Sequence, residues 1–365
     1  MDKAGLLLRI SDGKQVIRLE GTARRIWELL EYRTDPAAIA EKLAAEFSGT
    51  ADEIRADVEL FVGCLYEMGA VEACVAPTVA EQQRARYLHL LKRSLCNLIY
   101  PEHELRIRRL RNAPRMSDGE GADTLGQTRF LRDIRYRQPD AYDALVDAKH
   151  DCIFGLASGV PFCFPHTLLG LSALDNLERC AEQVFAEHIP GDFLEAGVCQ
   201  GGASIFLRAL QVAFGQGKRR LWLADSFQGP PAPASDVDLA SGVDFSEPSA
   251  PMVAFGLEGV QDNFIRYNLL DDGVFFLPGW FAETLPRAPI GPLAILRIDA
   301  DLYAATREVL ENLYDRVSRG GFVIVDDYVY PFCRQAVDGF RVERHIGEPL
   351  RYADRTVVYW RKEEG

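Results

Sequence analysis

Four aspartates stand at the ends of two apolar runs near the carboxyl terminus of the chain. The stretch "PLAILRIDAD" places Asp299 and Asp301 after the first run, and "FVIVDDY" places Asp326 and Asp327 after the second. Continuous apolar runs of this kind are typical of parallel strands that are covered on both faces. Because open parallel sheets bind ligands at the carboxyl ends of their strands, these acids are expected to converge on one site.

Three of these acids, Asp299, Asp326 and Asp327, are the predicted metal ligands. They cannot stay ionised together at low cost unless a cation compensates their charge. Oxygen ligands with positions left for water suit Mg²⁺, whereas the soft ligands that zinc prefers are too few. The metal could hold a substrate oxygen and lower its pKa, and Asp299, or alternatively His166, could remove the proton as general base. Asp301 is instead expected to cap the next helix, and a rim of solvated acids is the competing interpretation.

A second set of candidates lies where an earlier strand gives way to a helix. In "DFLEAGVCQGGAS", Glu195, Gly197 and Gly201 occupy the turn, where glycines let a ligand approach the backbone. The G-x-G-x-x-G pattern of dinucleotide enzymes is incomplete here, and no phosphate-binding P-loop is present. The acid and the glycines suit S-adenosylmethionine, a ligand with a cationic head. Asp225, at the end of the next strand, is predicted to accept from both ribose hydroxyls, or else to cap a turn.

An alternation of strands and helices from Gly191 onward is expected to position these residues. The predicted strands are residues 192–198, 220–226, 273–281, 292–300 and 322–328, followed by an antiparallel pair at 341–346 and 355–361. The pattern predicts an α/β fold with a seven-stranded, doubly wound sheet. Residues 227–252, rich in Pro, Ala, Ser and Asp, are too long for a turn and are expected to fold over the site.

Length, charge and cysteine content narrow the class of protein. A chain of 365 residues predicts several units, here 1–76, a linker with amphipathic helices and a lid-length loop at 77–150, and a main domain at 151–365. The net charge of −13, with mixed signs, argues against a nucleic-acid-binding face. Eight scattered cysteines without a C-x-x-C pair, and no signal-peptide or membrane-spanning run, predict a soluble cytoplasmic protein with reduced thiols and no membrane contact.

The first domain is predicted to be a hairpin followed by three short helices, a winged-helix-like α+β unit. Asp12-Gly13 marks the hairpin turn, and the helices are expected to begin after Gly21, at Pro36 and near Thr50. The third helix is rich in acids, which phosphate would repel, so nucleic-acid binding is not expected.

This domain resembles a known family. "LEGTARRIWELLEYRTDPAAIAEKLAAEFSGTADEIRADVELFVGCLYEMGAVE" is similar to PqqD-type domains, the peptide-recognition elements of ribosomal peptide biosynthesis, and the likeness covers about residues 4–74. It implies that the leader of a precursor peptide binds as an added β-strand. The residues expected to bind it are Val16, Ile17, Leu19, Arg55, Val58 and Glu59. A docking or dimerisation module without a peptide ligand is the alternative.

From about Arg84 to Lys362 the chain resembles the TylF/MycF-type (macrocin) O-methyltransferases. The likeness rests on "LLKRSLCNLIY", "PHTLLGLSALDNL", "GDFLEAGVCQGGASIFLRAL", "LWLADSFQGPP", "FLPGWFAETLP", "LRIDADLY" and "GGFVIVDDY". It implies a class I S-adenosylmethionine methyltransferase fold, with Mg²⁺ on the acids named above. The implied cofactor contacts are Thr167, Glu195, Gly197, Gly201, Ser204, Asp225, Ser226 and Trp280. Where the family usually has an aromatic-basic pair, this chain has Cys199-Gln200.

Together the two resemblances predict an S-adenosylmethionine-dependent, Mg²⁺-assisted O-methyltransferase. Because a peptide-recognition domain is fused to it, the expected substrate is a ribosomally made precursor peptide, methylated on a hydroxyl or carboxylate oxygen. The alternative substrate is a sugar hydroxyl of a small-molecule natural product, with the first domain structural. A non-catalytic protein that binds a peptide and a nucleoside is a third reading. A homo-oligomer, a dimer, is also expected.

Overall fold

The computed structural model describes residues 6–9, 16–19, 21–30, 36–46, 51–67, 78–111, 129–149, 166–246 and 255–363. The chain divides into two compact units, Met1–Gln82 and Gln83–Gly365. The predicted hairpin turn at Asp12-Gly13 and the predicted lid at 112–127 lie outside the described residues. No helix within the described ranges is long and apolar enough to span a membrane.

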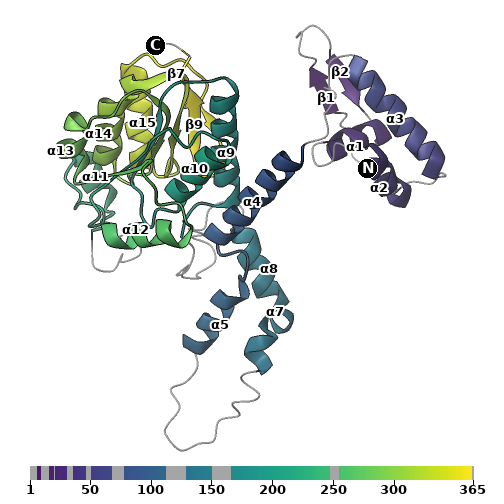
Figure 1. The fold of residues 1–365 in the computed structure, drawn as a ribbon, viewed down its shortest axis with the longest axis horizontal. Helices are drawn as coiled ribbons and strands as arrows, with labels where there is room; N and C mark the ends of the chain where they lie inside the picture. Colours follow the sequence, from purple (N-terminus) through teal and green to yellow (C-terminus); the bar gives the residue numbers. More distant parts are fainter. Residues whose placement is uncertain are drawn as a thin grey trace, which may run out of the picture. The chain divides into compact units, whose positions relative to one another are not determined.

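The N-terminal unit contains two strands followed by three helices, as predicted (Figure 1). The strands β1 (Leu6–Arg9) and β2 (Val16–Leu19) pair antiparallel, and α1 (Gly21–Leu30), α2 (Pro36–Glu46) and α3 (Ala51–Glu67) follow. Pro36 opens α2, a position that suits proline because its missing N–H would have no helical partner there. Ile26, Ile39, Leu43 and Val58 bring the three helices together in one small core.

This core places the residues predicted to bind a leader peptide in different environments. Val58 is 1% exposed, so its side chain belongs to the core of the unit and not to an outward face. Arg55 and Glu59, on the same helix, are exposed. Val16, Ile17 and Leu19 lie in β2, and only their backbone pairing with β1 is described.

Helices precede the sheet in the second unit. They are α4 (Val79–Leu95), α5 (Glu102–Arg111), α7 (Ile134–Arg137), α8 (Pro139–Ala148) and α9 (Leu171–Ala186). Lys149, at the end of α8, is fully buried and pairs with Glu104 of α5 at 2.7 Å. Lys92 of α4 likewise bonds Glu178 of α9 at 2.5 Å. Opposite charges therefore join these helices where their apolar faces meet.

The sheet of the second unit has seven strands in the order β5-β4-β3-β6-β7-β9-β8, which confirms the predicted number. They are β3 (Asp192–Ala196), β4 (Leu221–Asp225), β5 (Val274–Pro278), β6 (Leu293–Ile298), β7 (Val317–Val325), β8 (Arg351–Tyr352) and β9 (Val358–Arg361). β3 to β7 run parallel, and β9 and β8 add an antiparallel edge. The order reverses at β3, where the chain crosses from β5 back to β6, and ligands of open sheets bind at such a point.

Helices cover both faces of this sheet (Figure 1). Because neighbouring side chains of a strand point to opposite faces, Phe193 joins the core under α9 and α10 (Gly202–Ala213), and Leu194 joins the core under α14 (Tyr303–Leu313) and α15 (Pro331–Glu343). α12 (Leu257–Arg266) packs on the first core through Phe264. The doubly wound prediction is confirmed.

One predicted strand is wrong. Residues 341–346 were expected to form one strand of the antiparallel pair, but the first three of them, 341–343, are the last turn of α15. Pro331 begins the helix, and the buried residues Phe332, Ala336 and Phe340 recur every four residues, a helical period. The partner of β9 is instead the two-residue strand β8, which is too short to leave a pattern in the sequence.

Candidate functional site

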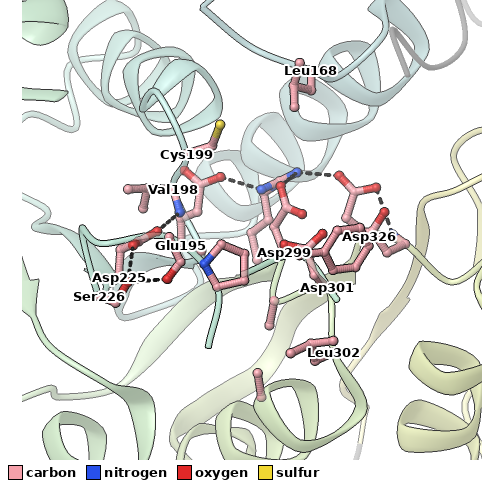
Figure 2. Close-up of a pocket in the computed structure, with 18 of the residues that line it drawn as sticks. Leu168, Glu195, Val198, Cys199, Asp225, Ser226, Asp299, Asp301, Leu302 and Asp326 are labelled. Carbon is pink, nitrogen blue, oxygen red and sulfur yellow. Dashed lines mark hydrogen bonds and ion pairs between the residues drawn. The ribbon is translucent and has the colours of Figure 1, made fainter. Parts of the chain in front are cut away.

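A cavity of about 710 Å³ lies at the carboxyl ends of the parallel strands. Acids from four neighbouring strands line its floor in the order of the sheet: Asp225 at the end of β4, Glu195 on β3, Asp299 after β6 and Asp326 after β7 (Figure 2). The sheet topology thus brings together residues that are up to 131 positions apart in the chain, as the strand-end argument predicted.

Asp225 forms the cofactor-side end of this row. Its carboxylate accepts a hydrogen bond from the N–H of Val198 at 2.7 Å (Figure 2). It accepts a second from the N–H of Phe227, also at 2.7 Å. Burial raises the pKa of Asp225, and these N–H donors work against that rise. The carboxylate therefore ties the turn after β3 to the end of β4, as the turn-cap interpretation required. It also lines the cavity, as contact with a ribose requires.

The glycines of the turn after β3 are needed because the chain approaches itself closely. A Cβ on Gly197 would lie 1.7 Å from the carbonyl oxygen of Asp299, and one on Gly202 would lie 2.1 Å from that of His166. Gly201 has a left-handed φ of 84°, and a Cβ there would meet Val260 at 2.8 Å. The prediction explained these glycines by the approach of a ligand. The structure gives a different reason, contact between neighbouring segments of the protein.

Glu195 and Ser204 form a buried layer beneath the turn. Ser204 is fully buried and its hydroxyl donates to one oxygen of Glu195, while Arg297 donates to the other oxygen. Burial raises the pKa of Glu195 to about 7, because the loss of solvation outweighs the attraction of Arg297. Both side chains already have protein partners, so their placement suits holding the floor in shape more than direct contact with a cofactor.

Arg297 is the central cation of the floor, and the sequence analysis missed it. Its side chain is 2% exposed and contacts Glu195, Asp299 at 2.9 Å and Asp326 at 2.6 Å (Figure 2). Burial opposes its charge, but the three carboxylates raise the pKa of Arg297 overall. The available signal was a single arginine inside the apolar run "LAILRI", because a buried charge requires partners.

The acids that come together differ from the predicted metal set. One carboxylate oxygen from each of Asp299, Asp301 and Asp327 lies within 4.8 Å of the others. Asp326 instead bonds Arg297 through one oxygen and accepts the N–H of Asp327 at 2.9 Å through the other. Asp301, which was not among the predicted ligands, joins Asp299 and Asp327 in this cluster, and the metal role of Asp326 stays a prediction.

Asp301 is not the cap of the following helix, which corrects the prediction. The N-cap residue of α14 is Leu302, and Asp238 accepts from the free N–H groups of the first turn. Asp301 has a left-handed φ of 59°, and its side chain bonds that of Asp327. Burial, and then repulsion from Asp299, raises the pKa of Asp301 to about 7. Burial and the neighbouring acids also raise the pKa of Asp327 well above its usual value.

The remaining predicted residues lie around the rim and the cofactor side. The ring Nδ1 of His166 lies 2.8 Å from the hydroxyl of Tyr267, and burial, with a contribution from Arg266, lowers the pKa of His166. Thr167 accepts the N–H of Leu169 at 3.1 Å through its hydroxyl. Trp280, at the start of α13 (Phe281–Thr284), is 37% exposed and lines the cavity.

Ser226, directly after Asp225, shapes the turn that leaves β4. Its hydroxyl donates to the carbonyl of Gly229 at 2.7 Å and accepts the N–H of Gln228 at 3.0 Å. Cys199, where the family pattern has an aromatic residue, has a left-handed φ of 49° and lines the cavity.

Comparisons with known proteins agree with this geometry. Residues 84–362 match the macrocin-O-methyltransferase (TylF) family, and residues 6–71 match coenzyme PQQ synthesis protein D (PqqD). The chain is 41% identical over 283 residues to 8-demethyl-8-(2,3-dimethoxy-alpha-L-rhamnosyl)-tetracenomycin-C 4'-O-methyltransferase of Streptomyces olivaceus, covering 78% of this chain and 95% of that protein. It is 45% identical to mycinamicin III 3''-O-methyltransferase of Micromonospora griseorubida, over 54% of this chain and 78% of the relative.

A solved structure supports the same assignment. The O-methyltransferase NovP superposes with a TM-score of 0.61 at 34% identity, covering 77% of this chain and all of NovP. The second unit, with its parallel sheet, its acid-lined cavity and this likeness, has the class I methyltransferase fold. The chain belongs to the macrocin-O-methyltransferase (TylF) family and is an S-adenosylmethionine-dependent O-methyltransferase.

Proposed function

We propose that this enzyme methylates a sugar hydroxyl of a small-molecule natural product. The observation that carries the proposal is the match of the methyltransferase unit to relatives named for O-methylation of such compounds. One acts on a rhamnosyl-tetracenomycin, one on mycinamicin III and one on demethyldecarbamoylnovobiocin. This reading replaces a precursor peptide as the leading candidate, because none of these relatives is named for a peptide substrate.

The residues of the cavity fit S-adenosylmethionine. Asp225 lines the wall at the end of β4, within the same cavity as Gly197 and Trp280. In a sheet of this topology an acid at that position can accept from ribose hydroxyls. The excess of carboxylates along the floor favours a ligand with a positive sulfonium. We assign the cofactor to the half of the cavity next to Asp225, where Thr167 and Ser226 shape the adjoining turns.

The cluster Asp299, Asp301 and Asp327 fits Mg²⁺. Its oxygens are hard donors within 4.8 Å of one another. Burial, and then repulsion from neighbouring acids that a cation would relieve, raises the pKa values of Asp301 and Asp327. When bound, Mg²⁺ would supply positive charge that lowers the pKa of an acceptor hydroxyl. Asp326, predicted from the sequence as a ligand, bonds Arg297 and the N–H of Asp327, and its role at a metal stays a prediction.

A side chain of the protein can then accept the proton of the acceptor hydroxyl. We assign Asp299 as general base, because its carboxylate lines the cavity floor and Arg297 holds it at 2.9 Å. As the acceptor oxygen forms its bond to the methyl carbon, its proton passes to this carboxylate. The carbon–sulfur bond breaks, and its electron pair returns to sulfur, which leaves as neutral S-adenosylhomocysteine. His166 is the alternative base, although its Nδ1 faces Tyr267.

The lining of the cavity supports a neutral acceptor. Apolar residues from the segment after β4, among them Pro230, Pro231 and Phe245, face the floor. The basic residues of the described lining are His166, Arg297 and Arg355, and Arg297 is already matched by three carboxylates. A phosphate or carboxylate on the acceptor would meet repulsion from the acids. An uncharged glycoside would meet apolar walls and an acidic floor that can accept from its hydroxyls.

The decisive assay incubates the full chain with S-adenosylmethionine, Mg²⁺ and a panel of neutral glycosides, and follows products by mass spectrometry. The panel includes mycinamicin III and demethyldecarbamoylnovobiocin, with their sugar-free scaffolds as matched controls. The expected result is the gain of one methyl group on the sugar of at least one glycoside, lost in the Asp299→Asn variant. Methylation of the scaffolds alone, or of leader-bearing peptides alone, would refute the sugar acceptor.

A precursor peptide remains a second candidate because residues 6–71 match the PqqD family. Among the described strands, β1 and β2 pair only with each other, so each has a free edge to which an extended peptide could add. Binding a leader there would raise the effective concentration of the linked core peptide at the cavity. Arg55 and Glu59 are exposed on α3 and could contact such a leader.

Removal of residues 1–82 separates the two candidates. The cut follows the boundary between the compact units, and retained affinity for S-adenosylhomocysteine shows that the remaining unit is intact. For a small glycoside, kcat/KM should stay within about threefold, because no contact of the acceptor is lost. For a leader-bearing peptide it should fall by about 10²–10⁴-fold, the gain that tethering provides.

A further inference from the structure

Helix α14 begins without a cap from its own sequence. Its N-cap residue Leu302 is apolar, and its side chain makes no capping hydrogen bond. Asp238 instead accepts from the N–H groups of Tyr303 at 2.7 Å and Ala304 at 3.1 Å. A carboxylate at this position satisfies free donors and faces the positive end of the helix dipole. The cap of α14 therefore comes from a residue 65 positions earlier in the chain.

The capping carboxylate is itself held in place. Asp238 lies on the short helix α11 (Asp236–Ser241) and is 1% exposed. The hydroxyl of Ser235 donates to its carboxylate at 2.6 Å and accepts its N–H at 3.0 Å. The hydroxyl of Ser241 donates to its carbonyl at 2.6 Å. A side chain with this many partners has little freedom to turn, so the bridge from α11 to α14 is rigid at both ends.

The bridge joins two walls of the cavity. On one side, the segment from Gly229 to Phe245 supplies apolar lining residues, including Pro230 and Pro231. On the other side, the segment that leads into α14 supplies Asp299 and Asp301. The side chain of Asp238, in the first segment, hydrogen-bonds directly to the N–H groups at the start of α14, where the second segment ends. This contact therefore links the apolar wall to the part of the chain that carries the reacting acids.

We propose that Asp238 is a positioning residue that fixes the acceptor wall relative to the acids of the floor. It acts through the backbone of α14 and does not touch the reacting atoms. A misplacement of about 1 Å between an acceptor and its catalytic groups can cost on the order of 10²-fold in rate. The cofactor half should not depend on this contact, because Asp225 is held separately by Val198 and Phe227. Loss of Asp238 should therefore separate acceptor use from cofactor binding.

The experiment compares Asp238→Ala, Asp238→Asn and Asp236→Asn in the full chain. Asp236 lies on the same short helix but is exposed, so its variant controls for charge loss on α11. Hydrogen exchange by mass spectrometry with bound S-adenosylhomocysteine follows residues 229–246 and 302–306, and calorimetry measures the affinity for S-adenosylhomocysteine. Steady-state kinetics use the first glycoside of the panel above that the wild-type enzyme methylates. Only this last measurement rests on the proposed function.

Asp238→Ala should speed exchange in both segments at least tenfold while the affinity for S-adenosylhomocysteine stays within twofold. It should raise KM for the glycoside at least tenfold. The effects of Asp238→Asn should lie between those of Asp238→Ala and the wild type, since the amide keeps one acceptor oxygen. Asp236→Asn should match the wild type. The proposal is overturned if hydrogen exchange at residues 229–246 is unchanged in Asp238→Ala. It is also overturned if the affinity for S-adenosylhomocysteine falls together with the activity toward the glycoside. If no glycoside is methylated, the sugar acceptor fails, and the exchange and affinity measurements still decide the role of Asp238.

Discussion

Asp301 and Asp327 share a hydrogen bond between their carboxyl groups on the floor of the cavity. Two carboxyl groups can share a hydrogen bond only when one of them carries a proton, and burial raises the pKa of both Asp301 and Asp327. A cation and this proton therefore compete for the same oxygens.

The pH dependence of Tm should differ with and without Mg²⁺. Burial raises the pKa of Asp301 to about 7 from an ordinary value of 3.8. Between these values the folded state binds more protons than the unfolded state, so the contribution of this group to stability falls as pH rises through the window. Without metal, Tm should decrease between about pH 5 and pH 8. Mg²⁺ should raise Tm at the upper end, where it replaces the lost proton, and much less at the lower end.

Differential scanning calorimetry with chelator or with Mg²⁺ at both pH values makes this measurement. Asp301→Asn is the matched variant, since it removes the titrating group at nearly constant size, and it should flatten the pH dependence. A rise in Tm on adding Mg²⁺ that is equal at the two pH values would contradict a cation site built on this pair.

Replacing Arg297 by Met should destabilise the fold more than replacing any single acid of the cavity floor. It would leave the buried Glu195 and Asp326 and the partly buried Asp299 without their shared cation. Removing one partner of a buried ionic group typically costs about 3–5 kcal/mol. Urea unfolding measures the loss, with Arg319→Met as control because Arg319 is exposed on β7. The double variant Arg297→Met with Glu195→Gln should recover part of the loss, and strict additivity would argue against the ion pair.

The fold was largely predictable because its signals are local. Continuous apolar runs mark the parallel strands, and the acids that follow them mark the strand ends. The strand order then brings Asp225, Glu195, Asp299 and Asp326 to one cavity. The segment 341–346 was misassigned because a short apolar-polar stretch fits a strand and the end of an amphipathic helix equally well.

The partners of the site residues were not predictable in the same way. Arg297 meets Glu195 across 102 positions, and Asp238 meets Tyr303 across 65. No local spacing encodes either contact, because each depends on how neighbouring strands and their connections are placed in three dimensions. One error has this origin, because Asp301 was assigned to a cap that Asp238 supplies. The contact of Asp326 with Arg297 was missed for the same reason.

Gly197→Ala should prevent the formation of a native site. The added Cβ would lie 1.7 Å from the carbonyl oxygen of Asp299, and the left-handed φ of 85° adds strain. Since this overlap is with backbone, β3 and β6 would have to separate where they hold the cofactor turn and the acids. The expected result is loss of S-adenosylhomocysteine binding and a lower Tm. Gly215→Ala is the control, since its φ is also positive but its Cβ would meet nothing within 4 Å. Equal effects of the two variants would point to backbone strain alone.

The choice between Asp299 and His166 as general base can be settled by comparing Asp299→Asn with His166→Gln. Removal of a general base typically costs about 10²–10⁴-fold in kcat, and we expect that loss for Asp299→Asn only. The lowered pKa of His166 favours a neutral imidazole at pH 7, but its Nδ1 is engaged by the hydroxyl of Tyr267. His166→Gln should therefore keep kcat within about tenfold.

Asp299 is also a proposed metal ligand, so its variant needs a second readout. If Asp299→Asn still gains Tm with Mg²⁺ at the pH where the wild type does, the lost turnover reflects the missing base. If that gain disappears, the carboxylate is needed first to hold the cation, and the base must be sought elsewhere. A kcat that collapses in His166→Gln, with a normal response to Mg²⁺, would move the proton transfer to His166.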